Sequence, residues 1–171
     1  MDNFQTDFGG FKQKNGCLLF TIFKAASDLS ETGAEISHNR CNILIDRLNN
    51  FTRTSYNPSR TALSAEDDND EPGVYVWDHE AVFNEAFITL GSRYRMKYVA
   101  RIYMPWEIAK GHTSFDNRSN VYQIGGWDLV ILQIRTTNGN GHFRLANWDP
   151  YEPGTEMADL KSLRYYKLWR V

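Results

Sequence analysis

A cysteine early in the chain and a histidine late in it have the chemistry of a nucleophile and its base. Cys17 follows Asn15-Gly16 and opens an apolar segment with helical spacing. In the first turn of a helix, backbone N–H groups without helical partners and the helix dipole favour a thiolate. His142 directly follows a turn sequence and begins a predicted strand. A thiol at a helix start and an imidazole at a sheet rim can meet where the two layers join, and cysteine nucleophiles need such a base.

Both residues also have structural interpretations. A free cysteine is among the most buried residue types, so Cys17 can simply pack with its apolar neighbours. His142 can be an exposed residue beside a turn. The other three histidines lie in or beside predicted helices or in a loop: His38, His79 and His112. Of the four, His142 alone is predicted at a sheet rim.

The elements that must position these residues divide the chain into two halves. Three helices are predicted in the first half, at Cys17 to Ser30, at Glu35 to Asn50 and at Asp78 to Leu90, the last with Asp78 as N-cap. The second helix is expected to turn four apolar residues inward: Ile36, Ile43, Leu44 and Leu48. Ser55 to Gly73 is expected to be a loop, because it contains Asn-Pro-Ser, an acidic run and Pro-Gly.

The second half has the pattern of a sheet. Four short segments rich in β-branched and aromatic residues are predicted strands: Tyr98 to Tyr103, Trp127 to Thr136, Gly141 to Trp148 and Leu163 to Val171. Asn138-Gly139-Asn140-Gly141 predicts a hairpin between the second and third of these. Val130, Leu132 and Ile134 then share one face of their strand, while Leu129, Ile131 and Gln133 share the other. Helices first and antiparallel strands afterwards predict one α+β domain over residues 1–171, with two packed layers.

Composition argues against several classes of partner. With 19 Lys+Arg and 21 Asp+Glu the net charge is −2, which gives no long-range attraction for nucleic acid. No segment approaches the roughly 18 to 20 apolar residues of a membrane span, and the first residues lack the order of a signal peptide, so a cytoplasmic location is expected. Cys17 and Cys41 are too few for a disulfide framework and lack metal-ligand spacing, so no metal or cofactor is expected.

Two short motifs resemble those of a known family. Gln13-Lys14-Asn15-Gly16-Cys17-Leu18-Leu19 and the later Gly141-His142-Phe143-Arg144-Leu145 resemble papain-like cysteine peptidases of the bacteriocin-leader-processing type, with their phage and bacterial relatives. The resemblance covers both ends of the chain and little of residues 50–94. It implies a papain-like fold, with N-terminal helices packed on a C-terminal antiparallel sheet.

The same resemblance implies roles for single residues. Cys17 would be the nucleophile, His142 its base, and Gln13 a donor to the oxyanion that forms when a carbonyl is attacked. Gln13 is only four residues before the cysteine, whereas the relatives have five or six, so the backbone N–H of Cys17 can take over this role. Gln5 is a weaker substitute.

Three residues are candidates for the group that orients the imidazole. Asp149, in Trp148-Asp149-Pro150, matches the Asp-Pro of the relatives best, but seven residues of continuous strand would carry it about 23 Å from His142. Asp149 therefore requires a tight turn near Ala146-Asn147. Asp159 is the second candidate for this orienting role, and Asn147 is the third.

The sequence leaves the function open among three hypotheses. The first is a cysteine hydrolase, a peptidase or amidase, acting on a cell-wall peptide, a protein leader or an isopeptide tag. The second is an inactive papain-like binding protein, such as a phage or mobile-element accessory factor that inhibits a host protein, because fold does not decide activity. The third is an acyltransferase that uses the same thiolate.

Three tryptophans could line a groove or pack at its rim: Trp106, Trp127 and Trp148.

Overall fold

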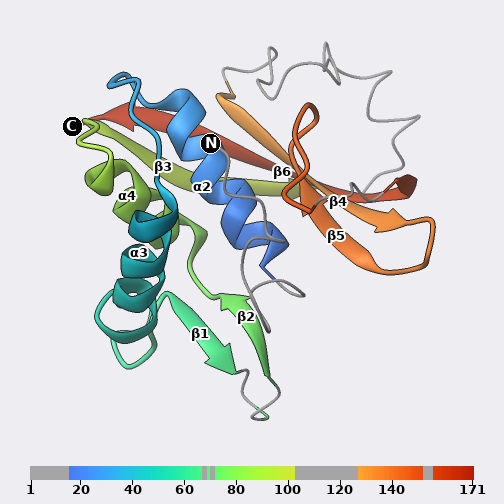
Figure 1. Cartoon of the computed structure of the whole chain (residues 1–171), viewed down its shortest axis with the longest axis horizontal. Helices are drawn as coiled ribbons and strands as arrows, with labels where there is room; N and C mark the ends of the chain where they lie inside the picture. The colour runs from blue at the N-terminus through green and yellow to red at the C-terminus, as the bar shows by residue number, and fades with distance from the viewer. Residues whose placement is uncertain (1–15, 67–68, 70–71, 103–126, 152–155) are drawn as a thin grey trace.

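The structure is a computed structural model that describes residues 16–66, 69, 72–102, 127–151 and 156–171. Within these residues it has three helices, a two-stranded antiparallel sheet and a four-stranded antiparallel sheet. The predicted α+β class is therefore confirmed. In Figure 1 the helices lie beside and in front of the long strands, and α2 points its first turn toward the β4–β5 hairpin.

The three helices have the predicted positions with small changes at their ends. They are α2 (Cys17–Leu29), α3 (His38–Asn50) and α4 (His79–Thr89). The side chain of Asp78 accepts a hydrogen bond from the backbone of Ala81, which is the predicted cap of α4. Ser37 caps α3 in the same way, so this helix begins three residues later than expected from Glu35.

One predicted core position in α3 is wrong. Ile43 is 61% exposed, whereas the buried positions of this helix are Cys41, Leu44, Ile45 and Leu48. These four recur at intervals of three and four residues and so share one face, and Ile43 lies about 100° around the helix from Leu44. Burial of Ile43 was predicted from its apolar residue type, but its position around the helix decides that it is exposed.

The four-stranded sheet has the order β3-β6-β4-β5. The strands are β3 (Tyr94–Ile102), β4 (Leu129–Thr136), β5 (Gly141–Arg144) and β6 (Met157–Arg170). The last strand starts six residues before the predicted Leu163. The prediction began too late because the first residues of the strand are exposed and lack the apolar pattern of a core strand. Strand β6 lies between β3 and β4, so it holds the sheet together.

The predicted hairpin between β4 and β5 is confirmed. The pairing runs from Leu132 opposite Arg144 to Arg135 opposite Gly141. Gly139 supplies the turn residue with a φ of 89°, a conformation that L side chains rarely adopt. This hairpin fixes the register, and therefore the place, of His142.

The prediction that Ser55 to Gly73 is a loop is wrong in its second part. Strands β1 (Leu63–Glu66) and β2 (Pro72–Val76) form an antiparallel pair, with Leu63 opposite Val76. Leu63 is buried against the helices. Turn residues and the acidic run dominated the composition of this segment, and the two strands are too short to outweigh them.

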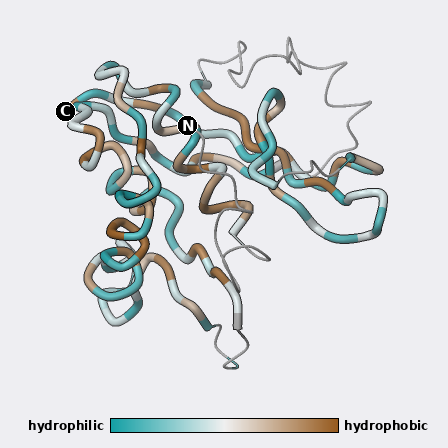
Figure 2. Tube along the Cα trace, viewed as in Figure 1, coloured by the Kyte–Doolittle hydropathy of each residue, from teal (hydrophilic) through white to brown (hydrophobic). Residues whose placement is uncertain are grey.

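Apolar side chains cover both faces of β4, as predicted. Leu129 and Ile131 pack with the helices in one cluster, and Val130, Leu132 and Ile134 pack in a second cluster on the other face. Figure 2 shows apolar stretches along α2 and β4. No helix in the described part of the chain is long and apolar enough to cross a membrane.

Candidate active site

Cys17 is the first residue of α2 and is partly buried. The preceding Gly16 has no side chain to cap the helix, and its carbonyl accepts the first helical hydrogen bond, from Phe20 at 3.0 Å. The first N–H groups of a helix have no partner within the helix, and here the N-cap residue offers no side chain to accept from them. They are suited to receive a developing oxyanion beside the sulfur.

A buried threonine joins the start of α2 to β5. The hydroxyl of Thr21 lies 2.6 Å from the carbonyl oxygen of Cys17 and 3.3 Å from that of Phe143. Thr21 is completely buried, and Phe143 is the residue after His142. One side chain therefore contacts the backbone of the thiol-bearing residue and the backbone next to the imidazole.

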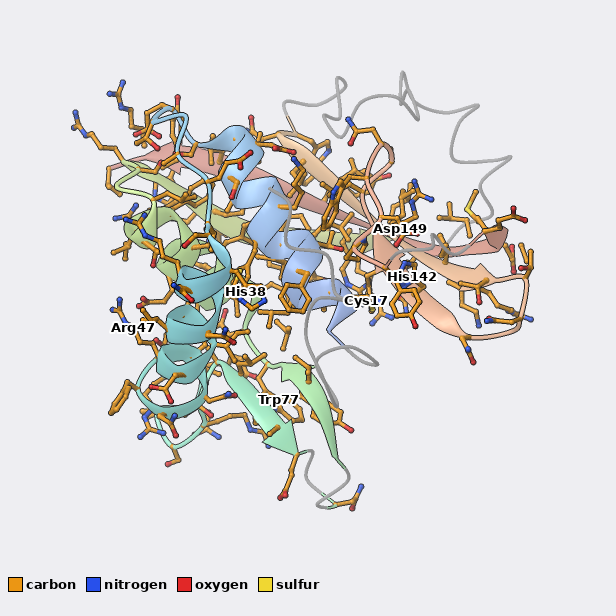
Figure 3. The ribbon with its side chains drawn as sticks, in the orientation of Figure 1. Cys17, His38, Arg47, Trp77, His142 and Asp149 are labelled. Carbon is orange, nitrogen blue, oxygen red and sulfur yellow. The ribbon has the colours of Figure 1, made fainter. Side chains whose placement is uncertain are left out.

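His142 lies in β5 opposite Ile134 and is only 5% exposed. It is not the exposed turn residue that its position in the sequence also allowed. Its Nε2 atom is 2.7 Å from Oδ1 of Asp149. Figure 3 shows Cys17, His142 and Asp149 together where α2 meets the sheet.

The tight turn that Asp149 requires is present. The N–H of Leu145 donates to the carbonyl of Trp148 at 3.0 Å, so the chain reverses at Ala146 and Asn147. Asp149 then lies beside its own strand rather than beyond the end of it. Its Oδ1 atom also accepts a hydrogen bond from the backbone of Tyr151, which fixes the carboxylate further.

Arg144 braces this turn. Its guanidinium donates to the carbonyls of Leu145 at 2.9 Å and Ala146 at 3.2 Å, and its Nη1 is 3.8 Å from Oδ2 of Asp149. Because Oδ1 binds His142 and Oδ2 faces Arg144, the carboxylate is held at both oxygens.

The electrostatics favour a protonated imidazole. Burial lowers the pKa of His142, but hydrogen bonds to Asp149 and Cys17 and their negative charges raise that pKa more, to about 9. The Cys17 thiol therefore lies within hydrogen-bonding reach of the ring. Since Asp149 occupies Nε2, Nδ1 is the nitrogen left for the sulfur.

The other two candidates for the orienting residue lie elsewhere. Asp159 is more than half exposed and is 3.8 Å from Arg135. Asn147 is exposed in the tight turn. Asp149, the first-ranked candidate, is hydrogen-bonded to His142.

Some of the remaining candidate residues lie in the part of the chain that the structure describes, and others lie outside it. His38 is exposed at the start of α3, and Cys41 is fully buried inside that helix. Trp127 and Trp148 are partly buried against the two apolar clusters. Three candidates lie outside the described residues: Gln5, Gln13 and Trp106.

No group of three or more His, Cys, Asp or Glu residues that could hold a metal ion occurs among the described residues. His112, a histidine without a predicted role, lies outside them.

Two residues of this site were missed by the sequence analysis. Thr21 is four residues after Cys17, a helical spacing that places both on one face, so its contact with the carbonyl of Cys17 was open to inference. Arg144 lies inside the Gly-His-Phe-Arg-Leu motif. Its hydrogen bonds to the carbonyls of Leu145 and Ala146 depend on the geometry of the tight turn, which the sequence does not determine.

Comparisons with protein-family models, curated proteins and solved structures find no match for this chain, so the site's chemistry rests on its own geometry.

Proposed function

We propose that this protein is a cysteine hydrolase that cleaves a peptide or related amide bond. The observation that carries the proposal is the hydrogen-bonded series Cys17, His142, Asp149, with a buried imidazole whose pKa is raised to about 9. A buried acceptor on one ring nitrogen and a thiol at the other are the arrangement of a nucleophile, a base and an orienting group.

The reaction follows from these positions. The Cys17 thiolate attacks the carbonyl carbon, and the oxyanion forms beside the N–H groups of the first turn of α2. The His142 imidazolium gives its proton to the leaving amine as the C–N bond breaks, which leaves a thioester on Cys17 and a neutral imidazole. His142 then takes a proton from water, whose oxygen attacks the thioester. The carboxylic acid departs, and the thiolate and imidazolium are restored.

The papain-like interpretation of the fold belongs to the same proposal. It is supported by the chain order of the three residues, by the position of Cys17 at a helix start and by the position of His142 on an antiparallel sheet. Substrates of this class are a cell-wall peptide, a protein leader or an isopeptide-linked tag.

A peptide library tests the proposal. The wild-type protein is incubated with mixed peptides, and cleavage is followed by mass spectrometry. Cys17→Ala and His142→Ala should each abolish cleavage, and the double variant should be no slower than either single one, because a nucleophile and its base act as a unit. Cleavage that survives Cys17→Ala would exclude this mechanism.

A biological readout separates the alternative functions. If inhibition of a host process by the protein persists at full strength in Cys17→Ala, the protein acts by binding. If product appears only when an amine acceptor is supplied, the thioester is transferred and the protein is an acyltransferase.

A further inference from the structure

His79, the first residue of α4, is hydrogen-bonded to a strand of the four-stranded sheet. Its Nδ1 atom lies 2.7 Å from the hydroxyl of Tyr166 in β6, and the planes of the two rings differ by only 19°. The ring of Tyr98 in β3 lies 5.3 Å from the imidazole, measured between ring centres. The imidazole therefore lies where the start of α4 meets β3 and β6.

The direction of this hydrogen bond follows from the burial of Tyr166. The side chain is completely buried, and in the described part of the chain its hydroxyl makes one hydrogen bond, which is to His79. Burial raises the pKa of Tyr166, so the phenol is protonated at neutral and acid pH. A buried O–H group without an acceptor is destabilising. Tyr166 therefore donates and Nδ1 accepts, which requires a neutral imidazole with its proton on Nε2.

The surroundings oppose a second proton on His79. Burial lowers its pKa most, the charges of Arg164 and Arg101 lower it too, and Asp78 raises it, with a net result of about 4 instead of 6.5. The positive end of the dipole of α4 also disfavours a cation at this first position. The other titratable side chains that line the hollow of about 390 Å³ beside the ring are Tyr56, Glu80 and Tyr98.

The two neighbouring carboxylates are poorly placed to accept from a protonated imidazole. Oδ1 of Asp78 already accepts from the N–H of Ala81, and Oδ2 accepts from the N–H and the hydroxyl of Ser55. Asp78 would have to give up the cap of α4 to bind the ring. Glu80 is the next residue along the helix, and adjacent helical residues do not face each other.

We propose that His79 and Tyr166 form an acid-sensitive latch, which holds the start of α4 on β3 and β6 and is released when His79 is protonated. An imidazolium carries a proton on Nδ1 and cannot accept from Tyr166, so the buried hydroxyl would lose its acceptor. Phe83 of α4, whose ring lies 4.9 Å from that of Tyr166, would separate from it on release. The latch contains none of Cys17, His142 and Asp149, so it does not depend on the proposed hydrolase function.

The pH range of the release follows from the two states of the latch. The pKa of His79 is about 4 in the closed state and near the ordinary 6.5 once the ring is exposed, so the closed state is fully favoured above about pH 6.5. This preference is lost as the pH falls toward 4, and the opening equilibrium should rise by roughly 10²-fold. His142 stays protonated throughout this range, because its pKa is about 9.

Hydrogen exchange of the full-length protein tests the latch. Amide protection is measured from pH 7 to pH 4.5 and corrected for the intrinsic exchange rate at each pH. The amides of α4 should lose protection by roughly 10²-fold, while those of α3 should change much less. Unchanged protection in α4, or an equal loss in both helices, would contradict a local release. An NMR titration should also find His79 neutral down to about pH 5, and a pKa near 6.5 would overturn the proposal.

His79→Asn separates the latch from other titrating groups. The amide oxygen of asparagine can accept from Tyr166 near the place of Nδ1 but does not titrate, so α4 should stay protected at pH 4.5. His38→Asn is the matched control, since His38 is the exposed first residue of α3 and also follows a capping side chain. This control should open like the wild type. If α4 opens at the same pH in His79→Asn as in the wild type, another group triggers the opening and the latch is wrong.

Discussion

At the scale of single residues, the chemistry depends on which partner each nitrogen of His142 has. Nε2 is bound to Asp149, and this carboxylate is fixed by Arg144 and by the backbone of Tyr151. The ring therefore has one orientation, which leaves Nδ1 as the nitrogen available to the thiol. The catalytic proton should leave and return at that atom.

Asp149→Asn tests the orienting role. The variant should lower kcat by roughly 10²- to 10⁴-fold, less than the loss from Cys17→Ala, because the thiol remains but the imidazolium loses its charged partner. Steady-state kinetics on a cleaved peptide measure this. Asp159→Asn is the control and should be nearly silent, and the opposite order of effects would reassign the third residue.

The pH profile gives a second prediction. Activity should fall on the alkaline side with an apparent pKa near 9, because the imidazolium that protonates the leaving amine is lost there. In Asp149→Asn this limb should move to lower pH, toward the ordinary value of 6.5, since the carboxylate raises the pKa of His142. An alkaline limb that stays in place would show that another group titrates.

At the scale of elements, the site exists because the start of α2 is attached to β5. Thr21 makes this contact through one hydroxyl, which lies close to the carbonyls of Cys17 and Phe143. The β4–β5 hairpin then sets the register of His142, and the tight turn after β5 returns Asp149 to it. An error in any of these three local structures would separate the catalytic groups.

Thr21→Val tests the contact between the helix and the strand. Valine has a similar shape but no hydroxyl, so the variant should lose about 1 kcal/mol of stability and lower kcat more than it raises KM. Thr21→Ser should restore kcat, because it keeps the hydroxyl. Denaturant unfolding and peptide kinetics measure the two effects. An unchanged kcat in Thr21→Val would show that the Thr21 hydroxyl does not position the catalytic groups.

At the scale of the whole molecule, the sequence predicted those features that depend on local patterns. Asp78 as a cap, the Asn-Gly turn before His142 and the helix beginning at Cys17 each follow from neighbouring residues. The strands β1 and β2 were missed because their pairing is visible only in three dimensions. Arg101 and Arg164 meet at Gln133 through strand register, which no local pattern encodes.

The pKa of His142 differs between the folded and unfolded states, so the free energy of unfolding should change with pH. The folded-state pKa is raised above the ordinary 6.5 to about 9, so the stabilisation is fully present below about pH 6.5 and is lost as the pH rises through about 9. The contribution is on the order of 3 kcal/mol. Denaturant unfolding of wild type and His142→Gln from pH 6 to pH 10 should show a steeper decline in the wild type. Parallel curves would contradict the raised pKa.

The central claim is that Cys17 is a nucleophile paired with His142, and its reactivity tests this most directly. The folded protein is treated with iodoacetamide at pH 6, and the modification rates of Cys17 and Cys41 are measured by peptide mapping. Ordinary thiols are mostly protonated at this pH, so Cys17 should react far faster than the buried Cys41, and His142→Ala should slow Cys17 strongly. Faster modification of Cys41, or an unchanged rate at Cys17 in His142→Ala, would contradict the account.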